Sequence, residues 1–268
     1  MKRSILVALF ALFALLAPYA PVASAFADVT VKSTGASKGM GPGGTLTTTT
    51  YIKGNKMRTD SMIGDRTITM IFDVDAQRLY SLDSEKKEAS VWDMQTFGAN
   101  MQQSVDMSAM KSSIKPNGQT KQIAGKSATG YDMEMTMPTV LGGKSGMKMT
   151  VMLSGPLWIV KGAPGTSEYI NFYKGAAEKG WIFSDPRGAK GNPGQAKAMA
   201  EMQRQLAATG GIPYEQETTI KMIGEGPMAA MMAKMGMTMT MTVQSVDTGT
   251  LAADLFAVPA GYKVKEQK

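Results

Sequence analysis

The sequence predicts an α+β protein, mainly β, in which an antiparallel sheet has helices packed on one side. Residues 46–94 alternate apolar and polar side chains in short segments, which is the period of half-buried strands. Short turns rich in Gly, Asn and Asp separate the segments, and strands joined by such turns pair antiparallel. Residues 164–179 and 195–208 are each closed by glycine and are predicted helices.

Residues 1–27 have the pattern of a secretory signal peptide. A basic pair precedes an apolar run at 5–16, and small residues allow cleavage after Ala25 or Ala27. The run is shorter than the roughly 20 residues of a membrane-spanning helix. No Cys follows it for lipid attachment. We therefore expect a periplasmic or otherwise exported protein, with residues 28–268 as a single domain and no integral membrane segment after cleavage.

The remaining elements follow from local patterns. A first strand at 28–32 is followed by a Gly-rich segment, 33–44, which is typical of a flexible loop. Tight hairpins are expected at Gly54-Asn55 and Gly64-Asp65, where positive φ is tolerated. Apolar residues at steps of three and four predict an amphipathic helix over 93–114. Later strands are predicted at 120–123, 128–137, 147–153, 215–223 and 237–246, and residues 157–160 form a short buried run.

Four motifs occur in a fixed order along the chain: GNKMRTDS, IFDVDAQRLYSLDSEKKEASVWDM, QTKQIAGKSATGYDM and DLFAVPAGYKV. Together they resemble the domain-of-unknown-function 4412 (DUF4412) family, which is related to the LolA/LolB-like outer-membrane lipoprotein carriers, over about residues 28–264. The resemblance implies a curved antiparallel sheet, an incomplete barrel, with helices on its concave side. The family commonly has a Cys after its IAG-type motif, where this chain has Gly125-Lys126-Ser127-Ala128. No catalytic residues carry over.

Composition excludes most catalytic chemistry. The chain has no His and no Cys, which removes the usual triads, thiolate nucleophiles, and His- or Cys-ligated metals. We expect no enzyme activity and no cofactor. Removing Lys2 and Arg3 lowers the formal net charge from +7 to +5, without a basic cluster that would predict nucleic-acid binding. Asp73 and Asp75 share a strand face and could contribute to a calcium site, but a turn that uses both carboxylates locally is favoured.

Methionine is the unusual feature, with 25 in the chain. Three interpretations compete: core packing, an adaptable cavity for a greasy ligand, and Cu(I) binding by thioethers. For a cavity, the predicted lining residues are Met70, Phe72, Phe97, Met101, Met135, Met239 and Met241. The candidate Cu(I) ligands are Met228, Met231, Met232 and Met235.

The sequence thus predicts an exported, non-enzymatic protein that binds a hydrophobic ligand, a lipid or lipoprotein acyl chain, between sheet and helices. The alternative is a structural or protein-interaction module of the cell envelope with a closed core. In that case Phe97, Met101 and Leu206 would fill the space between sheet and helices. Cu(I) binding is the third possibility.

Overall fold

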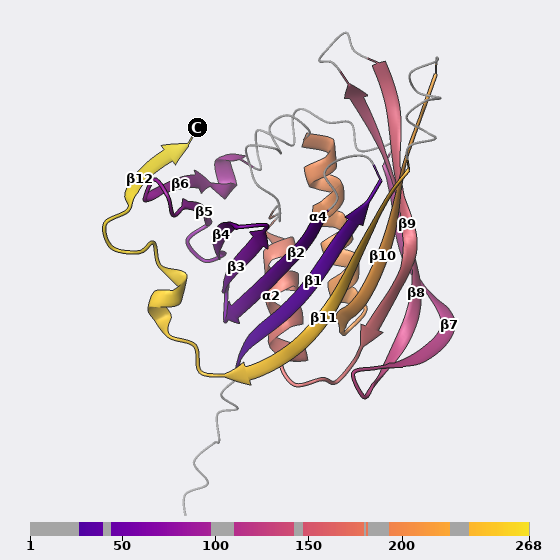
Figure 1. Ribbon diagram of the computed structural model, residues 1–268, viewed down its shortest axis with the longest axis horizontal. Helices are drawn as coiled ribbons and strands as arrows, with labels where there is room; N and C mark the ends of the chain where they lie inside the picture. The colour runs from indigo at the N-terminus through magenta and orange to yellow at the C-terminus, as the bar shows by residue number, and fades with distance from the viewer. Residues whose placement is uncertain are drawn as a thin grey trace, which may run out of the picture.

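A computed structural model describes residues 27–39, 44–97, 110–141, 147–179, 181, 193–225 and 236–267. Its strands form one 12-stranded sheet in the order β12-β6-β5-β4-β3-β2-β1-β11-β10-β9-β8-β7 (Figure 1). All neighbours pair antiparallel except β12 and β6, which are parallel. The predicted α+β, mainly β fold with an antiparallel sheet is confirmed.

The strands are β1 (Asp28–Lys38), β2 (Gly44–Lys53), β3 (Lys56–Ile63), β4 (Arg66–Asp73), β5 (Arg78–Asp83), β6 (Glu88–Asp93), β7 (Lys111–Ile123), β8 (Lys126–Leu141), β9 (Met147–Val160), β10 (Ile212–Gly224), β11 (Met237–Gly249) and β12 (Lys263–Gln267). Two α-helices, α2 (Thr166–Glu178) and α4 (Pro193–Ala208), and a 3-10 helix, η1 (Ala253–Phe256), complete these elements. Gly54 and Gly64 take positive φ (54° and 58°) at the two predicted hairpins.

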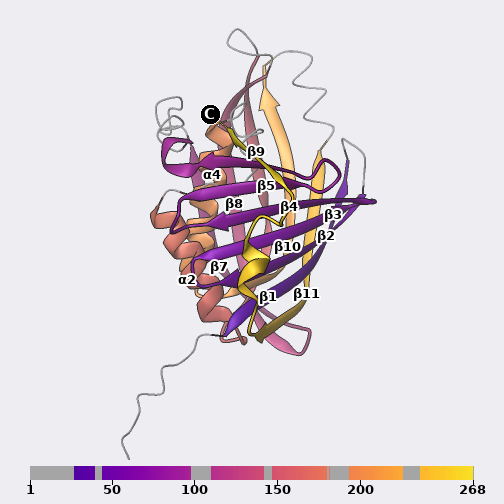
Figure 2. The same cartoon turned by 90° about the vertical axis from the view of Figure 1, so that its left-hand side faces the viewer.

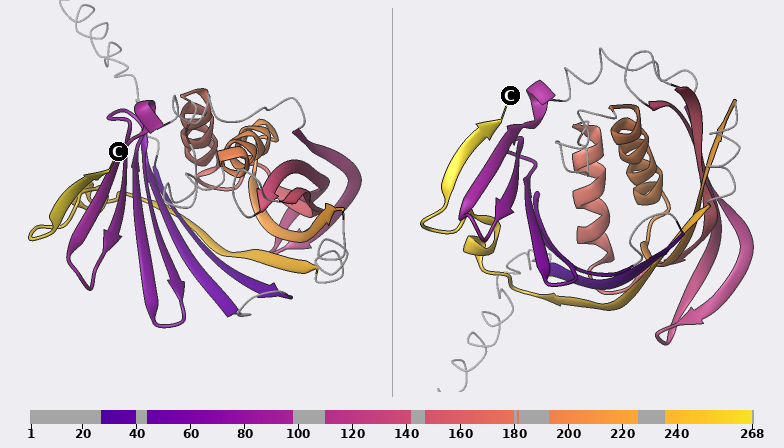
Figure 3. Two further views of the ribbon diagram at one scale, coloured as in Figure 1. Left: turned by 90° about the horizontal axis from the view of Figure 1, so that it is seen from above. Right: turned by 45° about the horizontal axis from the view of Figure 1, so that its top comes forward.

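The sheet curves around the two α-helices, which lie side by side in its concave side (Figure 3). Two buried clusters fill that side. One joins β1 to β6 with α2 and includes Phe72, Trp92 and Phe172. The other joins β8 and β9 with α4 and includes Met133 and Met202. Each helix therefore packs its apolar residues on a different part of the same concave face.

The C-terminal segment crosses the outer, convex face of the sheet (Figure 2). Phe256 of η1 is buried there against Ile71, Leu82 and Ala89. The segment then adds β12 to the edge of the sheet beside β6. The Arg58 guanidinium donates to the carbonyl of Leu255 at 3.1 Å, which fixes the segment to β3. The C-terminal segment thus covers part of the outer face of the sheet around β3 to β6.

Two predictions of local structure were wrong, and one strand was missed. Residues 33–38 belong to β1 and not to a loop, because they pair on both sides with β2 and β11. The predicted helix over 93–114 is helical at 94–97, but residues 111–114 begin β7, where Ile114 pairs with Met133. Strand β12 was missed because its five residues pair in parallel with a strand distant in sequence.

Candidate ligand-binding cavity

A cavity of about 580 Å³ lies between the concave face and the two helices. Its floor is formed by β1, β2, β10 and β11, and α2 and α4 form its roof. The lining residues include Val31 and Val243 from the α2 cluster and Met133 and Leu206 from the α4 cluster. The cavity therefore occupies the space that separates the two packed clusters.

The strand period of two decides which side chains reach the cavity. On β1 and β2, Ser33 pairs with Thr48 and Val31 pairs with Thr50, and all four line the cavity. One row further on, Gly35 pairs with Leu46 on one side and with Met241 on the other. Hydroxyl groups thus adjoin one another in the middle of the floor, followed by an apolar row.

The apolar row leads to the open end of the cavity. Ile63 and Met239, both lining residues, are 53% and 44% exposed. They lie where β3 ends and β11 begins. At the other end, Val31 is only 6% exposed and lies beneath helix α2. The cavity therefore has an apolar mouth and a closed inner end.

Two neighbouring phenols of α2, with their rings tilted relative to each other, face the cavity. The rings of Tyr169 and Tyr173 lie 4.7 Å apart, one helical turn from each other. Burial raises the pKa of Tyr173 to about 12, although a hydrogen bond with Tyr169 opposes the rise. The same hydrogen bond raises the pKa of Tyr169, after the larger effect of burial. Both phenols are therefore neutral near neutral pH.

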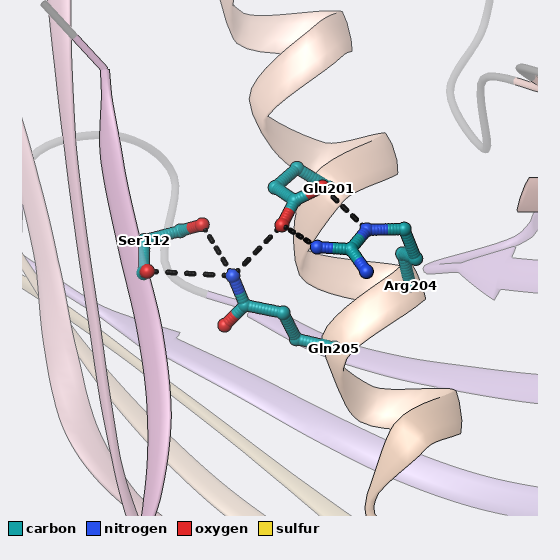
Figure 4. Close-up of polar contacts among 4 residues, drawn as sticks. All are labelled: Ser112, Glu201, Arg204 and Gln205. Carbon is teal, nitrogen blue, oxygen red and sulfur yellow. Dashed lines mark hydrogen bonds and ion pairs between the residues drawn. The ribbon is translucent and has the colours of Figure 1, made fainter.

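Helix α4 is attached to strand β7 by a polar network (Figure 4). The Gln205 amide nitrogen donates to the hydroxyl of Ser112 at 2.7 Å, to its carbonyl at 3.3 Å, and to Glu201 at 2.9 Å. Arg204 binds both oxygens of Glu201, and this contact holds the pKa of Glu201 below its usual range. The network fixes the roof helix over the cavity from its solvent side.

The sequence-predicted lining residues divide into two groups. Met239 and Met241 line the cavity. Met70, Phe72 and Phe97 lie in the cluster beneath α2, and Met135 lies in the cluster beneath α4. The four predicted copper ligands, Met228, Met231, Met232 and Met235, fall outside the described residues, as does Met101.

Several lining residues were not predicted. Tyr169, Met199 and Met202 come from the helices, and spacings of three and four along each helix could have identified them. Ser33 was missed because it fell in the segment predicted as a loop. Leu206, which the closed-core alternative expected to fill the space between sheet and helices, lines the cavity.

The turn uses the Asp73 carboxylate locally, whereas the Asp75 carboxylate contacts the side chains of Asn55 and Lys179 from other segments. Asp73 accepts from the backbone N–H of Ala76 at 3.0 Å and pairs with Lys56 at 2.7 Å, while Asn55 donates to Asp75 at 3.0 Å. In the described ranges, no three His, Cys, Asp or Glu side chains gather where they could hold a metal ion. No helix of the described chain combines the length and apolar character needed to span a membrane.

No protein-family model and no curated protein sequence matches the chain. Among solved structures, it is similar to an uncharacterized conserved protein from Thermus thermophilus, at 7% identity and a TM-score of 0.40, over 91% of this chain and 92% of that one. It is also similar to a LolA superfamily protein from Nitrosomonas europaea (8% identity, TM-score 0.28, 87% and 91% covered). A Vibrio parahaemolyticus domain described as a putative outer membrane lipoprotein-sorting protein gives 8% identity and a TM-score of 0.30 over the same shares. Structural neighbours thus include LolA superfamily proteins, while membership of the DUF4412 family stays a prediction.

Proposed function

We propose that this protein is an exported, non-enzymatic binding protein that holds a hydrophobic ligand, a lipid or acyl chain, in the cavity between sheet and helices. The observation that carries the proposal is the cavity itself. Its volume of about 580 Å³ lies within the range of small-molecule sites. Five methionines line it: Met133, Met199, Met202, Met239 and Met241. Flexible thioethers can adjust to apolar chains of different shape.

The size of the cavity favours a ligand over a closed core. At about 30 Å³ per molecule, the space would take on the order of 20 waters. The lining also holds Ser, Thr, Gln and Tyr side chains that could bind water, but Leu46, Ile63 and Met241 offer water no polar partner. An apolar chain can remove these side chains from water, at about 25 cal/mol per Å² of area. The cavity is therefore better suited to an apolar chain than to water alone.

Native mass spectrometry of the protein purified from the periplasm tests the proposal. We expect a co-purifying species of lipid mass that delipidation removes, and uptake of the neutral dye Nile red by the delipidated protein. Ser33→Phe would fill the middle of the floor and should weaken dye binding at least about tenfold, which corresponds to about 1.4 kcal/mol. Circular dichroism would establish that the variant is folded.

Thr47→Phe is the matched control. Thr47 is on the same strand as Thr48 but faces the outer side, beside Thr34 and Met62. This variant should bind the dye as the wild type does. A bare polypeptide mass, together with no dye uptake by the delipidated wild type, would show that the cavity is not a binding site.

A further inference from the structure

We propose that the cavity selects uncharged ligands: long apolar chains whose polar group is an alcohol, ester or amide, and not a carboxylate or phosphate. This inference rests on the proposed function and names the ligand class of the same cavity. Three features of the described residues carry it: the charges absent from the lining, the neutral hydrogen-bonding groups present in it, and the direction in which the charged side chains of the same strands point.

The described part of the lining is uncharged. Among the described residues around the cavity there is no Asp, Glu, Lys or Arg. An ionised group that entered would lose its hydration without gaining an opposite charge. Burial of an unpaired carboxylate is strongly unfavourable, because the low-dielectric surroundings cannot replace water.

The charged residues of the floor strands lie on its other side. On β10, Gln216 and Thr218 line the cavity, whereas Glu215 and Glu217 alternate with them and are directed outward. The Glu215 carboxylate pairs with Lys121 across the outer face. Lys32 on β1 likewise alternates with lining residues and is exposed. The same strands thus carry charge outward and neutral groups inward.

Neutral hydrogen-bonding groups replace these charges inside. Ser33, Thr48 and Thr50 place three hydroxyls on adjacent strands, and Thr48 lies 3.2 Å from the Ser61 hydroxyl. Across the floor, the Gln216 amide donates to the Thr218 hydroxyl at 2.9 Å. Hydroxyls and amides can both donate to and accept from an alcohol, ester or amide. The lining can therefore satisfy a neutral polar group without supplying a countercharge.

Competition between matched ligands tests the inference on the delipidated full-length protein. Nile red would be displaced by dodecanol, methyl dodecanoate or dodecanoate, at a pH where the acid is ionised. We expect the alcohol and the ester to displace the dye and the carboxylate to be at least about 100-fold weaker. A carboxylate that binds within about threefold of the alcohol, or more tightly, would overturn the selectivity and leave the proposed function intact.

If the wild type takes up neither dye nor alcohol, the proposed function fails, and the inference fails with it.

Two variants that each introduce a lysine provide a second test. Thr50→Lys places a cation in the cavity and should strengthen dodecanoate binding at least about tenfold relative to dodecanol. Thr49→Lys, which faces outward on the same strand, should leave the ratio unchanged. An unchanged ratio of dodecanoate to dodecanol affinity in a folded Thr50→Lys variant would overturn the inference. If that variant does not fold, the comparison of ligands on the wild type decides the question.

Discussion

Tyr173 is the side chain through which alkaline pH should destabilise the cavity wall. Its pKa is about 12 in the folded protein, against an ordinary value of 10.0. Because the folded state keeps the proton between pH 10 and about 12 while the unfolded chain has lost it, this contribution to stability is complete below pH 10 and is lost as the pH rises to about 12. Each pKa unit is worth about 1.4 kcal/mol, so the loss is at most about 2.7 kcal/mol. The Tyr173 ring is only half-buried and borders the cavity, so solvent screening reduces the effect, and the value of about 2.7 kcal/mol is an upper bound.

Urea unfolding of the wild type and of Tyr173→Phe, at one pH below 10 and one near 12, measures the effect. The variant should be less stable at the lower pH by about 1 kcal/mol, because the hydrogen bond between the two phenols is lost. Between the two pH values, the wild type should lose up to about 2.7 kcal/mol more than the variant. Lysines titrate in the same pH range in both proteins, so their effect cancels when the two losses of unfolding free energy are subtracted. Equal losses, within about 0.5 kcal/mol, would refute the assignment of a shielded phenol to this position.

Three further predictions concern the attachments around the cavity. Asp28→Asn should destabilise the fold by about 1–2 kcal/mol in thermal unfolding, because the carboxylate holds Lys53 at 2.6 Å and the Leu251 N–H at 2.8 Å; no change would contradict this role. Phe256→Ala should cost about 3 kcal/mol in urea unfolding, because the ring is buried beneath the C-terminal segment, whereas Val264→Ala, at a side chain 53% exposed, should cost less than about 0.5 kcal/mol. Gln205→Ala should cost about 1 kcal/mol and speed hydrogen exchange at the start of β7, and unchanged exchange would show that the network in Figure 4 does not hold α4 to β7.

The meander from β2 to β6 could be predicted from the sequence because its signals are local. Alternation sets the faces, and short turns set the neighbours, so Phe72 and Met57 face the concave side and are buried. The C-terminal strand could not be predicted in the same way. Its pairing with β6 joins residues about 175 apart in sequence, and no local turn signals such a contact.

A cavity between sheet and helices could be predicted from the sequence, but only some of its lining residues could. All four of Met239, Met241, Met135 and Phe72 were predicted to line the cavity, but only Met239 and Met241 do; Phe72 and Met135 lie in the packed clusters. The position of the helices explains the difference between the cavity-lining and the packed residues, because α2 covers Phe72 and α4 covers Met135. Strand periodicity gives the face of a side chain but not whether a helix packs on it. The cavity lies where neither helix closes on the floor.

The composition of the middle strands explains why the cavity is there. On either side of the cavity, large inward side chains such as Trp92 and Met133 fill the space beneath the helices. At the centre, Ser33 and Gly35 of β1 are small, and a Cβ added at Gly35 would lie 3.1 Å from the carbonyl oxygen of Thr240. Small, flexible residues in this segment predicted a loop, yet in the strand the small side chain of Ser33 leaves volume, while Gly35 allows the close approach of Thr240. A larger side chain at Ser33 would extend into the cavity and reduce its volume, so the small residue there keeps the floor open.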